Sequence, residues 1–333
     1  SESEPPMTAP PAPGSRDEGG FALLAVMLVL ALLGIIVAEF SFSMRLEATM
    51  VRSFKEEVVG AHLAEAAVQQ AIREILTDAA LLGFVEDSSA DERTSLLTFF
   101  KSPTHPLPRL LRSQVSLGEG RFSYRISDEE ARINLNLSPP ETIDRLLLTL
   151  GVEKQERDVI NDSLQDWKDA NELHRLNGAE SEDTYLKLPV PYRARNGNLE
   201  AIEEMLQIKG VAPALFYGSP DSPGLSEFVT VAGSGQVNIN TASHTVLKAL
   251  GLSDAEVTEI LQSRAVAPYA AVPARFAGRR LSVTSRTFRF EAEGGTGERL
   301  RSRVIAIVQK KTEAGGQAAP VILSWNTTSR SNP

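Results

Sequence analysis

The stretch that most constrains this chain is residues 21–38, FALLAVMLVLALLGIIVA, which contains no charged residue. A helix of this length rises about 27 Å, close to the roughly 30 Å hydrocarbon core of a bilayer. The segment is therefore predicted to span a membrane. The alternative, a buried core helix, is disfavoured because helices in soluble cores seldom run this long without a polar residue.

The residues before this apolar run are predicted to form a leader without a fold. Residues 1–20 hold five prolines and end in Glu18-Gly19-Gly20. Such composition is typical of disordered segments. An ordinary secretory signal has a basic start and a cleavage site after its apolar run, and this chain shows neither pattern. The chain does not begin with Met, and a start at Met7 would shorten the leader to residues 7–20.

Composition excludes several classes of function. The formal net charge is −9, which argues against a protein that mainly binds nucleic acid, since such proteins need clustered basic residues. The chain has no cysteine and therefore neither disulfides nor thiolate metal sites. Four widely separated histidines argue against a zinc centre; they are His62, His105, His174 and His244.

The apolar run continues into an amphipathic helix. Between Glu39 and Thr77, apolar residues recur every three or four positions, and no Gly-Pro break interrupts them. We predict one helix from Phe21 to about Thr77, with a second domain packed on its apolar face. The stripe consists of Met44, Ala48, Val51, Phe54, Val58, Ala61, Val68, Ile72 and Ile75.

Strand patterns lie on both sides of a helical segment. Alternating polar and apolar residues predict strands, and Pro139-Pro140-Glu141 opens a helical stretch that runs to about Gly210. A largely helical segment is thus inserted into a sheet, which makes the chain α+β. The Pro-rich residues 101–108 are predicted to form a loop. The predicted strands are residues 113–117, 121–127, 131–137, 228–232, 236–240, 281–293, 299–310 and 321–325.

Two segments repeat at an offset of one hundred residues. Leu150-Gly151-Val152 corresponds to Leu250-Gly251-Leu252, and each is preceded by a strand of the pattern apolar-Asn-apolar-Asn. The unit is interpreted as a strand end, a capped helix, a Leu-Gly turn and a second helix. Such hairpins are more often packing modules than ligand sites. Ser138 and Ser243 are predicted N-caps, Gly151 and Gly251 are predicted to follow the helix ends, and the paired Asn amides are predicted to bind turn backbone.

Residues 165–180 concentrate oxygen ligands at a predicted helix end. Asp166, Asp169, Asn171 and Glu180 are candidate ligands for a hard cation such as Ca²⁺, which takes six to eight oxygens in irregular geometry. The spacing is not that of an EF-hand loop, and a solvated acidic face is the alternative that the residues alone favour. No nucleophile elbow, phosphate loop or carboxylate pair stands out, so no catalytic site is predicted.

The order of several motifs resembles the minor pseudopilin K family of type II secretion systems, known as general secretion pathway protein K. The resemblance covers nearly the whole chain, and each motif is weak alone. The motifs are Gly19-Gly20-Phe21, residues 128–136 (DEEARINLN), residues 166–169 (DWKD), residues 176–180 (LNGAE), residues 191–197 (PYRARNG), Ile208-Lys209-Gly210 and residues 237–243 (VNINTAS).

The resemblance implies a pilin-like fold, with a long N-terminal helix packed on an antiparallel sheet and a large inserted helical domain of the helix-hairpin-helix or SAM-like kind. The predicted organisation follows from it. It consists of a leader (1–20), an N-terminal helix (21–77, with 21–42 in the membrane), a first pilin-like part (78–137), an inserted helical domain (138–226), returning strands (227–241), a second helical hairpin (242–280), C-terminal strands (281–326) and a tail (327–333).

The resemblance also implies processing and a location. A prepilin peptidase would cut between Gly20 and Phe21 and methylate the new amino group, leaving the helix as a single-pass anchor in the inner membrane with the C-terminal domain in the periplasm. The basic residues disagree mildly with this orientation, because Arg16 precedes the span while Arg45, Arg52 and Lys55 follow it.

The fifth residue after the implied cut is Ala25, where most pilins resemble one another in carrying Glu. A carboxylate at that depth costs about 2.5–3.5 kcal/mol unless it finds a partner, which in pilin-like filaments is the amine of the subunit above. Ala25 therefore suits a subunit at a filament tip. The implied partners are other minor pseudopilins, the inner-membrane assembly platform and secreted proteins, and the family's calcium sites strengthen the expectation of Ca²⁺ at the acidic cluster.

Two other functions, DNA binding and enzymatic catalysis, fit the sequence less well. The sequence VNINTA followed by a helical hairpin also resembles DNA-uptake modules with helix-hairpin-helix units. The hairpin at Leu250-Gly251-Leu252-Ser253 has a single glycine, and the chain is acidic, so DNA binding is disfavoured. A membrane-anchored enzyme would need a nucleophile or base that the sequence does not point to.

Overall fold

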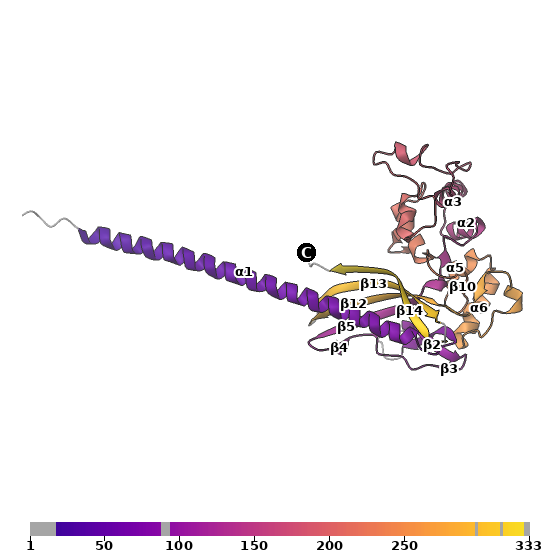
Figure 1. Cartoon of the computed structure of the whole chain (residues 1–333), viewed down its shortest axis with the longest axis horizontal. Coiled ribbons are helices and arrows are strands. Elements are labelled where there is room, and N and C mark those ends of the chain that lie inside the picture. The colour runs from indigo at the N-terminus through magenta and orange to yellow at the C-terminus, as the bar shows by residue number, and fades with distance from the viewer. Residues whose placement is uncertain (1–17, 88–93, 297–298, 314–315, 330–333) are drawn as a thin grey trace, which may run out of the picture. The chain divides into compact units, whose positions relative to one another are not determined.

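The computed structural model describes residues 18–87, 94–296, 299–313 and 316–329. The chain divides into two compact units, residues 1–56 and 57–333. Helix α1 (Glu18–Ile75) contributes its first part to one unit and its last turns to the other (Figure 1). Most of the predicted leader lies outside the described residues.

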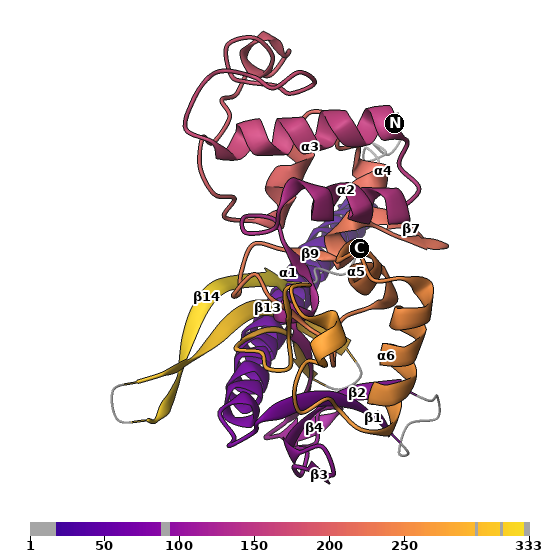
Figure 2. The same ribbon diagram turned by 90° about the vertical axis from the view of Figure 1, so that its right-hand side faces the viewer.

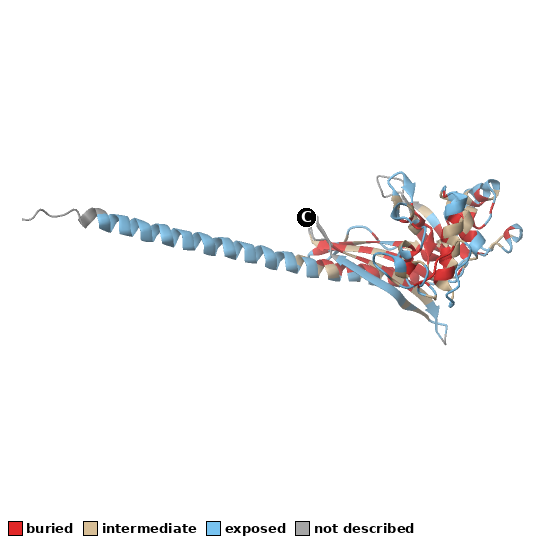
Figure 3. Ribbon diagram, turned by 90° about the horizontal axis from the view of Figure 1, so that it is seen from above, coloured by how far each residue is buried: buried red, intermediate tan, exposed pale blue. Residues whose placement is uncertain are grey.

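The first unit consists, in its described part, of α1 alone. Its side chains from Phe21 onward are exposed along the whole apolar run (Figure 3). By length and composition this helix can cross a membrane. The sequence predicted the helix to end at about Thr77, and it ends two residues earlier, at Ile75.

The second unit contains an antiparallel sheet with the strand order β14-β13-β12-β5-β4. Its central strands β5, β12 and β13 alternate buried residues with more exposed ones, as half-buried strands do. The buried side chains pack against the last part of α1 in one hydrophobic core. The strands are β4 (Val115–Leu117), β5 (Gly120–Asp128), β12 (Thr287–Thr296), β13 (Arg299–Thr312) and β14 (Ala318–Ser329).

A second, three-stranded antiparallel sheet was not predicted. It is formed by β1 (Leu81–Asp87), β2 (Thr94–Ser102) and β3 (His105–Pro106). The ends of β2 and β3 occupy part of the segment 101–108 that was predicted to be a loop. Leu82, Leu97 and Phe99 from this sheet join the same core as α1.

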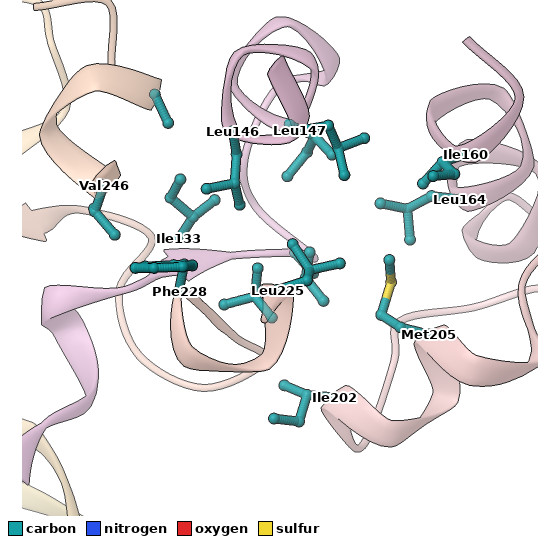
Figure 4. Close-up of a cluster of buried hydrophobic side chains, with 14 of the residues drawn as sticks. Ile133, Leu146, Leu147, Ile160, Leu164, Ile202, Met205, Leu225, Phe228 and Val246 are labelled. Atoms are coloured by element: carbon teal, nitrogen blue, oxygen red, sulfur yellow. The ribbon is translucent and has the colours of Figure 1, made fainter. Parts of the chain in front are cut away.

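The remaining chain is largely helical and has its own core. Figure 2 shows α2 and α3 beside each other, and Figure 4 shows apolar side chains from several segments converging, among them Leu146, Ile160 and Met205. The helices are α2 (Pro140–Thr149), α3 (Lys154–Lys168), α4 (Pro213–Tyr217), α5 (His244–Ala249) and α6 (Asp254–Val266), with short 3₁₀ turns at Glu129–Ala131, Tyr185–Lys187, Ile202–Gln207, Leu225–Glu227 and Ala274–Phe276.

The strands that border the helical part are shorter than predicted. The segments 131–137, 228–232 and 236–240 retain only two strand residues each. Two of these pieces pair in parallel with each other, and the third pairs with β11. The pieces are β6 (Ile133–Asn134), β9 (Val229–Thr230), β10 (Val237–Asn238) and β11 (Leu281–Ser282); β7 (Gly218–Ser219) and β8 (Ser222–Pro223) form a small hairpin.

The internal repeat forms two helical hairpins, α2 with α3 and α5 with α6. Gly151 and Gly251 follow the ends of α2 and α5 with φ values of 81° and 83°, which confirms their predicted role. Ser243 caps α5 by accepting a hydrogen bond from the backbone of Val246, as predicted. The prediction for Ser138 is wrong, because α2 begins after Pro139, which cannot offer a side-chain cap.

The first Asn of each pair binds the adjacent turn backbone, as predicted: the side-chain oxygen of Asn134 accepts from the N–H of Asn136, and that of Asn238 accepts from the N–H of Asn240. The second Asn of each pair binds a distant segment in the same way in both repeats. Asn136 donates to the carbonyl of Leu199 and accepts from its N–H. Asn240 does the same with Tyr269. Each of these side-chain amides satisfies both backbone groups of a residue that lies outside any strand. The observed fold is α+β, with a long N-terminal helix, antiparallel sheets and additional helices, as predicted.

Candidate cation site

Asp166 organises the loop that follows α3. Its side chain is fully buried in the last turn of that helix. One carboxylate oxygen, Oδ2, accepts hydrogen bonds from the backbone N–H groups of Arg175 and Ala179, both at 3.0 Å. The other, Oδ1, accepts from the guanidinium of Arg175 at 2.6 Å. Asp166 therefore holds the backbone of residues 175–179 against the C-terminal end of α3.

Glu180 is the member of the predicted set that lacks partners. Its side chain is only 1 % exposed, and neither carboxylate oxygen has a hydrogen-bond partner in the described part of the chain. Burial, followed by the charges of Asp166, Glu172 and Asp169, raises the pKa of Glu180 to about 7. A buried carboxylate without a donor is expensive, and such a group indicates a missing ligand or a catalytic role.

The two other predicted ligands lie in the turn after α3. Asp169 accepts hydrogen bonds from the backbone N–H and side-chain amide of Asn171 and from the guanidinium of Arg175. The side-chain oxygen of Asn171 accepts from the N–H of Leu173. The structure thus brings Asp166 and Asp169 together through Arg175, whereas Asn171 contacts only the turn.

The donor types fit a hard cation, although the present arrangement does not form a coordination shell. As the side chains stand, no three His, Asp or Glu residues within the described ranges are placed to hold a metal ion. In the described part of the chain, the guanidinium of Arg175 pairs with Asp166 and Asp169, while the Glu180 oxygens have no hydrogen-bond partner. Buried carboxylate oxygens and a nearby Asn oxygen are the ligand types that Ca²⁺ uses.

The packing around Asp166 makes Gly178 irreplaceable. A Cβ at this position would lie 1.8 Å from Oδ2 of Asp166 and 3.1 Å from the backbone N of Arg175. Asp166 is buried and held by two backbone N–H groups, so it cannot move aside. We expect Gly178→Ala to lower the free energy of unfolding by roughly 2–3 kcal/mol, measured by denaturant unfolding. An unchanged unfolding midpoint would contradict this packing.

The predicted processing residues lie in α1. Gly20 and Phe21 are helical, and Phe21 and Ala25 are exposed. The roles of Gly20, Phe21 and Ala25 remain predictions.

Sequence reasoning missed the importance of three consecutive acidic residues, Asp128, Glu129 and Glu130, which we call the acidic junction. All three are buried where β5 ends. Glu129 is paired with the guanidinium of Arg289 at 2.9 and 3.0 Å. Burial raises its pKa, but the hydrogen bonds from Arg289 and the charge of Arg132 outweigh burial and bring it below the ordinary value.

Within the described residues, Asp128 and Glu130 form no ion pair with a basic side chain and are satisfied by hydroxyl, amide and backbone groups. Asp128 accepts from Thr241, Ser285 and Asn238, and Glu130 accepts from Thr287 and Ser234. The junction therefore ties β5 to β12 and to the second Asn-containing segment, at Asn238 and Thr241. The signal in the sequence was the run of three acids directly after the alternating strand RFSYRIS.

Several basic residues near the glycine turn of the second hairpin make hydrogen bonds or ion pairs within the protein. The guanidinium of Arg279 donates to the carbonyl of Gly251, and Arg275 is paired with Glu259. Lys248 is paired with Asp254 at 2.8 Å. The ion pairs with Glu259 and Asp254 neutralise two of these basic side chains, which weakens the DNA-binding alternative.

Comparisons with known proteins agree on one family. Residues 127–218 match the family model "Type II secretion system (T2SS), protein K". A "putative type II secretion system protein K" of Escherichia coli K12 is 23 % identical over 272 residues, covering 75 % of this chain and 76 % of the relative. The type II secretion system protein K of Pseudomonas aeruginosa is 26 % identical over 246 residues, 71 % of this chain and 68 % of the relative.

A further relative and a solved structure extend this result. The protein K of Pectobacterium carotovorum is 34 % identical over 89 residues, 27 % of each chain. A chain of the GspK-GspI-GspJ complex from the enterotoxigenic Escherichia coli type 2 secretion system is similar with a TM-score of 0.55 and 19 % identity, covering 86 % of this chain and 99 % of that chain. At this identity the likeness shows the fold alone. Together, the family model and the relatives in sequence confirm the predicted resemblance of this chain to protein K of type II secretion systems.

Proposed function

We propose that this protein is a non-enzymatic minor pseudopilin that caps the tip of the type II secretion pseudopilus and initiates its assembly, for protein export across the outer membrane. The observation that carries the proposal is Ala25 in an apolar helix long enough to cross a membrane. A subunit with no neighbour above it has no amine to pair with a carboxylate at this position, so an apolar residue suits it.

The partners follow from the same role. The helix α1 would join other minor pseudopilins through its exposed apolar residues, and the solved relative forms a complex with GspI and GspJ. A prepilin peptidase would cut after Gly20 and methylate Phe21, and the assembly platform of the inner membrane would extract the anchor. The C-terminal domain would lie in the periplasm, where it meets secreted proteins.

The tip role predicts a specific response to Ala25→Glu. An unpartnered carboxylate within the span costs about 2.5–3.5 kcal/mol, and each 1.4 kcal/mol corresponds to tenfold. We expect Ala25→Glu to reduce secretion at least tenfold in cells that carry the complete secretion system. The measurement is the amount of secreted substrate in the medium. The matched control is Ala25→Gln, which has the same size without the charge and should secrete nearly as well as the wild type.

Mass spectrometry of the protein from membranes distinguishes assembly from processing. Wild type and both variants are expected to begin at Phe21 with one added methyl group. Equal secretion by Ala25→Glu and Ala25→Gln would contradict the tip assignment. An uncleaved wild-type chain in the presence of the peptidase would remove the basis for a pseudopilin role.

We also propose that the acidic cluster binds a divalent cation of the Ca²⁺ type, with Asp166, Asp169 and Glu180 as its carboxylate ligands and Asn171 beside them. Support comes from the buried, unpartnered oxygens of Glu180. The cation would stabilise the long irregular loop between α3 and α4, because it would neutralise carboxylates that otherwise repel one another. Its role would be structural.

Calcium should therefore raise the thermal stability of the detergent-solubilised full chain. A ligand at a hundred times its Kd contributes about 2.7 kcal/mol, which raises Tm by several degrees. Glu180→Gln is expected to remove most of this increase, whereas Glu182→Gln, whose side chain is exposed and paired with Arg193, should keep it. The measurement is Tm in excess Ca²⁺ and after chelation. An equal increase for Glu180→Gln and wild type would exclude Glu180 as a ligand.

A further inference from the structure

Arg175 lies between two of the proposed cation ligands. Its Nη1 donates to Oδ1 of Asp166 at 2.6 Å and to Oδ2 of Asp169 at 2.8 Å. Its own backbone N–H also donates to the Asp166 carboxylate. One nitrogen of the guanidinium thus bridges carboxylates from two residues, which is the contact that a bound cation would make with them.

The guanidinium reaches this position from the solvent side. The side chain of Arg175 is 42 % exposed, whereas that of Asp166 is fully buried. The backbone of residues 175–179 is held independently of the guanidinium: Asn177 donates to Asp162, and Lys209 donates to the carbonyl of Gly178. The guanidinium can therefore leave the carboxylates while the loop stays in place.

Arg175 neutralises only part of the acidic cluster. Its guanidinium makes no hydrogen bond to Glu180, whose two oxygens have no partner in the described chain. A guanidinium is planar and carries a single charge, so it hydrogen-bonds to carboxylates that lie in its own plane. A divalent ion is coordinated by oxygens from many directions. The cluster thus holds one more carboxylate than Arg175 can satisfy.

We propose that the Arg175 guanidinium occupies the position of the divalent cation in the metal-free protein and competes with it for Asp166 and Asp169. This inference rests on the cation site proposed above. Binding of the cation then requires Arg175 to release both carboxylates, and the lost charge-assisted hydrogen bonds weaken the apparent affinity. In return, the guanidinium neutralises these two carboxylates when no cation is bound, which stabilises the folded protein.

The test is calorimetric titration of CaCl₂ into the chelator-stripped, detergent-solubilised full chain. We expect Arg175→Gln to bind Ca²⁺ at least tenfold more tightly than wild type and, without metal, to melt at a lower temperature. Arg193→Gln is the matched control, because it removes an exposed arginine that is paired with Glu182 in the same loop region. Its Kd should equal that of the wild type.

Arg175→Lys tests whether the bridging geometry of the guanidinium or only its positive charge opposes Ca²⁺ binding. Lysine keeps the positive charge but presents a flexible point charge without the planar fork, so its Kd for Ca²⁺ should lie between those of wild type and Arg175→Gln. A Kd for Arg175→Lys equal to that of the wild type would show that charge alone acts, and would overturn the proposed occupation of the cation position.

The Kd values of wild type and Arg175→Gln distinguish the competition by Arg175 from the existence of a Ca²⁺ site. Equal Kd values for wild type and Arg175→Gln, or weaker binding by the variant, would overturn the competition and leave the site intact. Binding by Arg175→Gln but not by wild type would support the competition and refute calcium binding by the native chain. If neither protein binds Ca²⁺, both proposals fail.

Discussion

Replacing Gly294 with alanine is expected to lower the free energy of unfolding by roughly 3 kcal/mol, because helix α1 and strand β12 meet at this residue without room for a side chain. A Cβ at position 294 would lie 2.3 Å from the carbonyl oxygen of Gly60 and 2.5 Å from the backbone N of Ala64. Both atoms belong to the helix backbone, so no flexible side chain can yield. The helix must instead move off the sheet.

The control for Gly294→Ala is Gly197→Ala. A Cβ at Gly197 would meet only Arg195, at 3.9 Å and beyond, which is ordinary contact. That variant should stay within about 0.5 kcal/mol of the wild type. The measurement is denaturant unfolding of the purified full chain, followed by circular dichroism. Equal destabilisation by the two substitutions would show that the contact between Gly294 and α1 does not limit stability.

The parts of the fold that could be predicted are those with a local periodic signal. The stripe from Met44 to Ile75 identified α1 because its spacing of three and four is independent of the rest of the chain. The alternation in residues 121–127 identified β5 in the same way. The Leu-Gly turns at Gly151 and Gly251 were predictable because a positive φ after a helix end favours glycine.

Other strands were not predicted, or were predicted with the wrong length, because contacts between residues far apart in the sequence determine them. Strands β1 and β2 contain apolar runs such as LLGFV and SLLTFF, whose lack of alternation fits a strand or a buried helix equally well. The strands next to the helical part were predicted too long. Beyond Asn134 and Asn238 the amides of the Asn residues take over the backbone hydrogen bonds, so the ladder stops after two residues.

The candidate cation site also depends on contacts between residues that are separated in the sequence. The acidic residues could be found because they cluster in the sequence, but Arg175 was missed. It lies nine residues after Asp166, and only the return of the loop brings its guanidinium onto two carboxylates. Glu180 was predicted as one ligand among four, and the structure singles it out because both of its oxygens are buried and unpartnered. That distinction depends on burial, which the spacing of acidic residues does not report.

Asp128→Ala is expected to lower the free energy of unfolding by about 4 kcal/mol, the other large effect in this molecule. One carboxylate oxygen accepts from the hydroxyls of Thr241 and Ser285, at 2.5 and 2.6 Å, and from the amide of Asn238. The other accepts from the backbone N–H of Glu130. Removing the carboxylate leaves these buried donors without an acceptor, and each such loss costs about 1–3 kcal/mol.

Asp128→Asn keeps the shape of the side chain and tests the charge through pH. Burial, with a smaller contribution from the charge of Glu130, raises the pKa of Asp128 to about 6, against an ordinary value of 3.8, although hydrogen bonds from Ser285 and Thr241 oppose the increase. The native state therefore binds this proton more tightly than the unfolded state. The resulting stability is fully present below about pH 4 and is lost as the pH rises through 6.

The advantage of wild type over Asp128→Asn should consequently shrink between pH 4 and pH 7. The decrease should be on the order of 3 kcal/mol, since each pK unit corresponds to about 1.4 kcal/mol. Denaturant unfolding of both proteins across this range measures it, and the groups that titrate alike in both cancel in the difference. A difference that does not change with pH would mean that Asp128 stays ionised in the folded protein, so that the hydroxyls of Thr241 and Ser285 outweigh its burial.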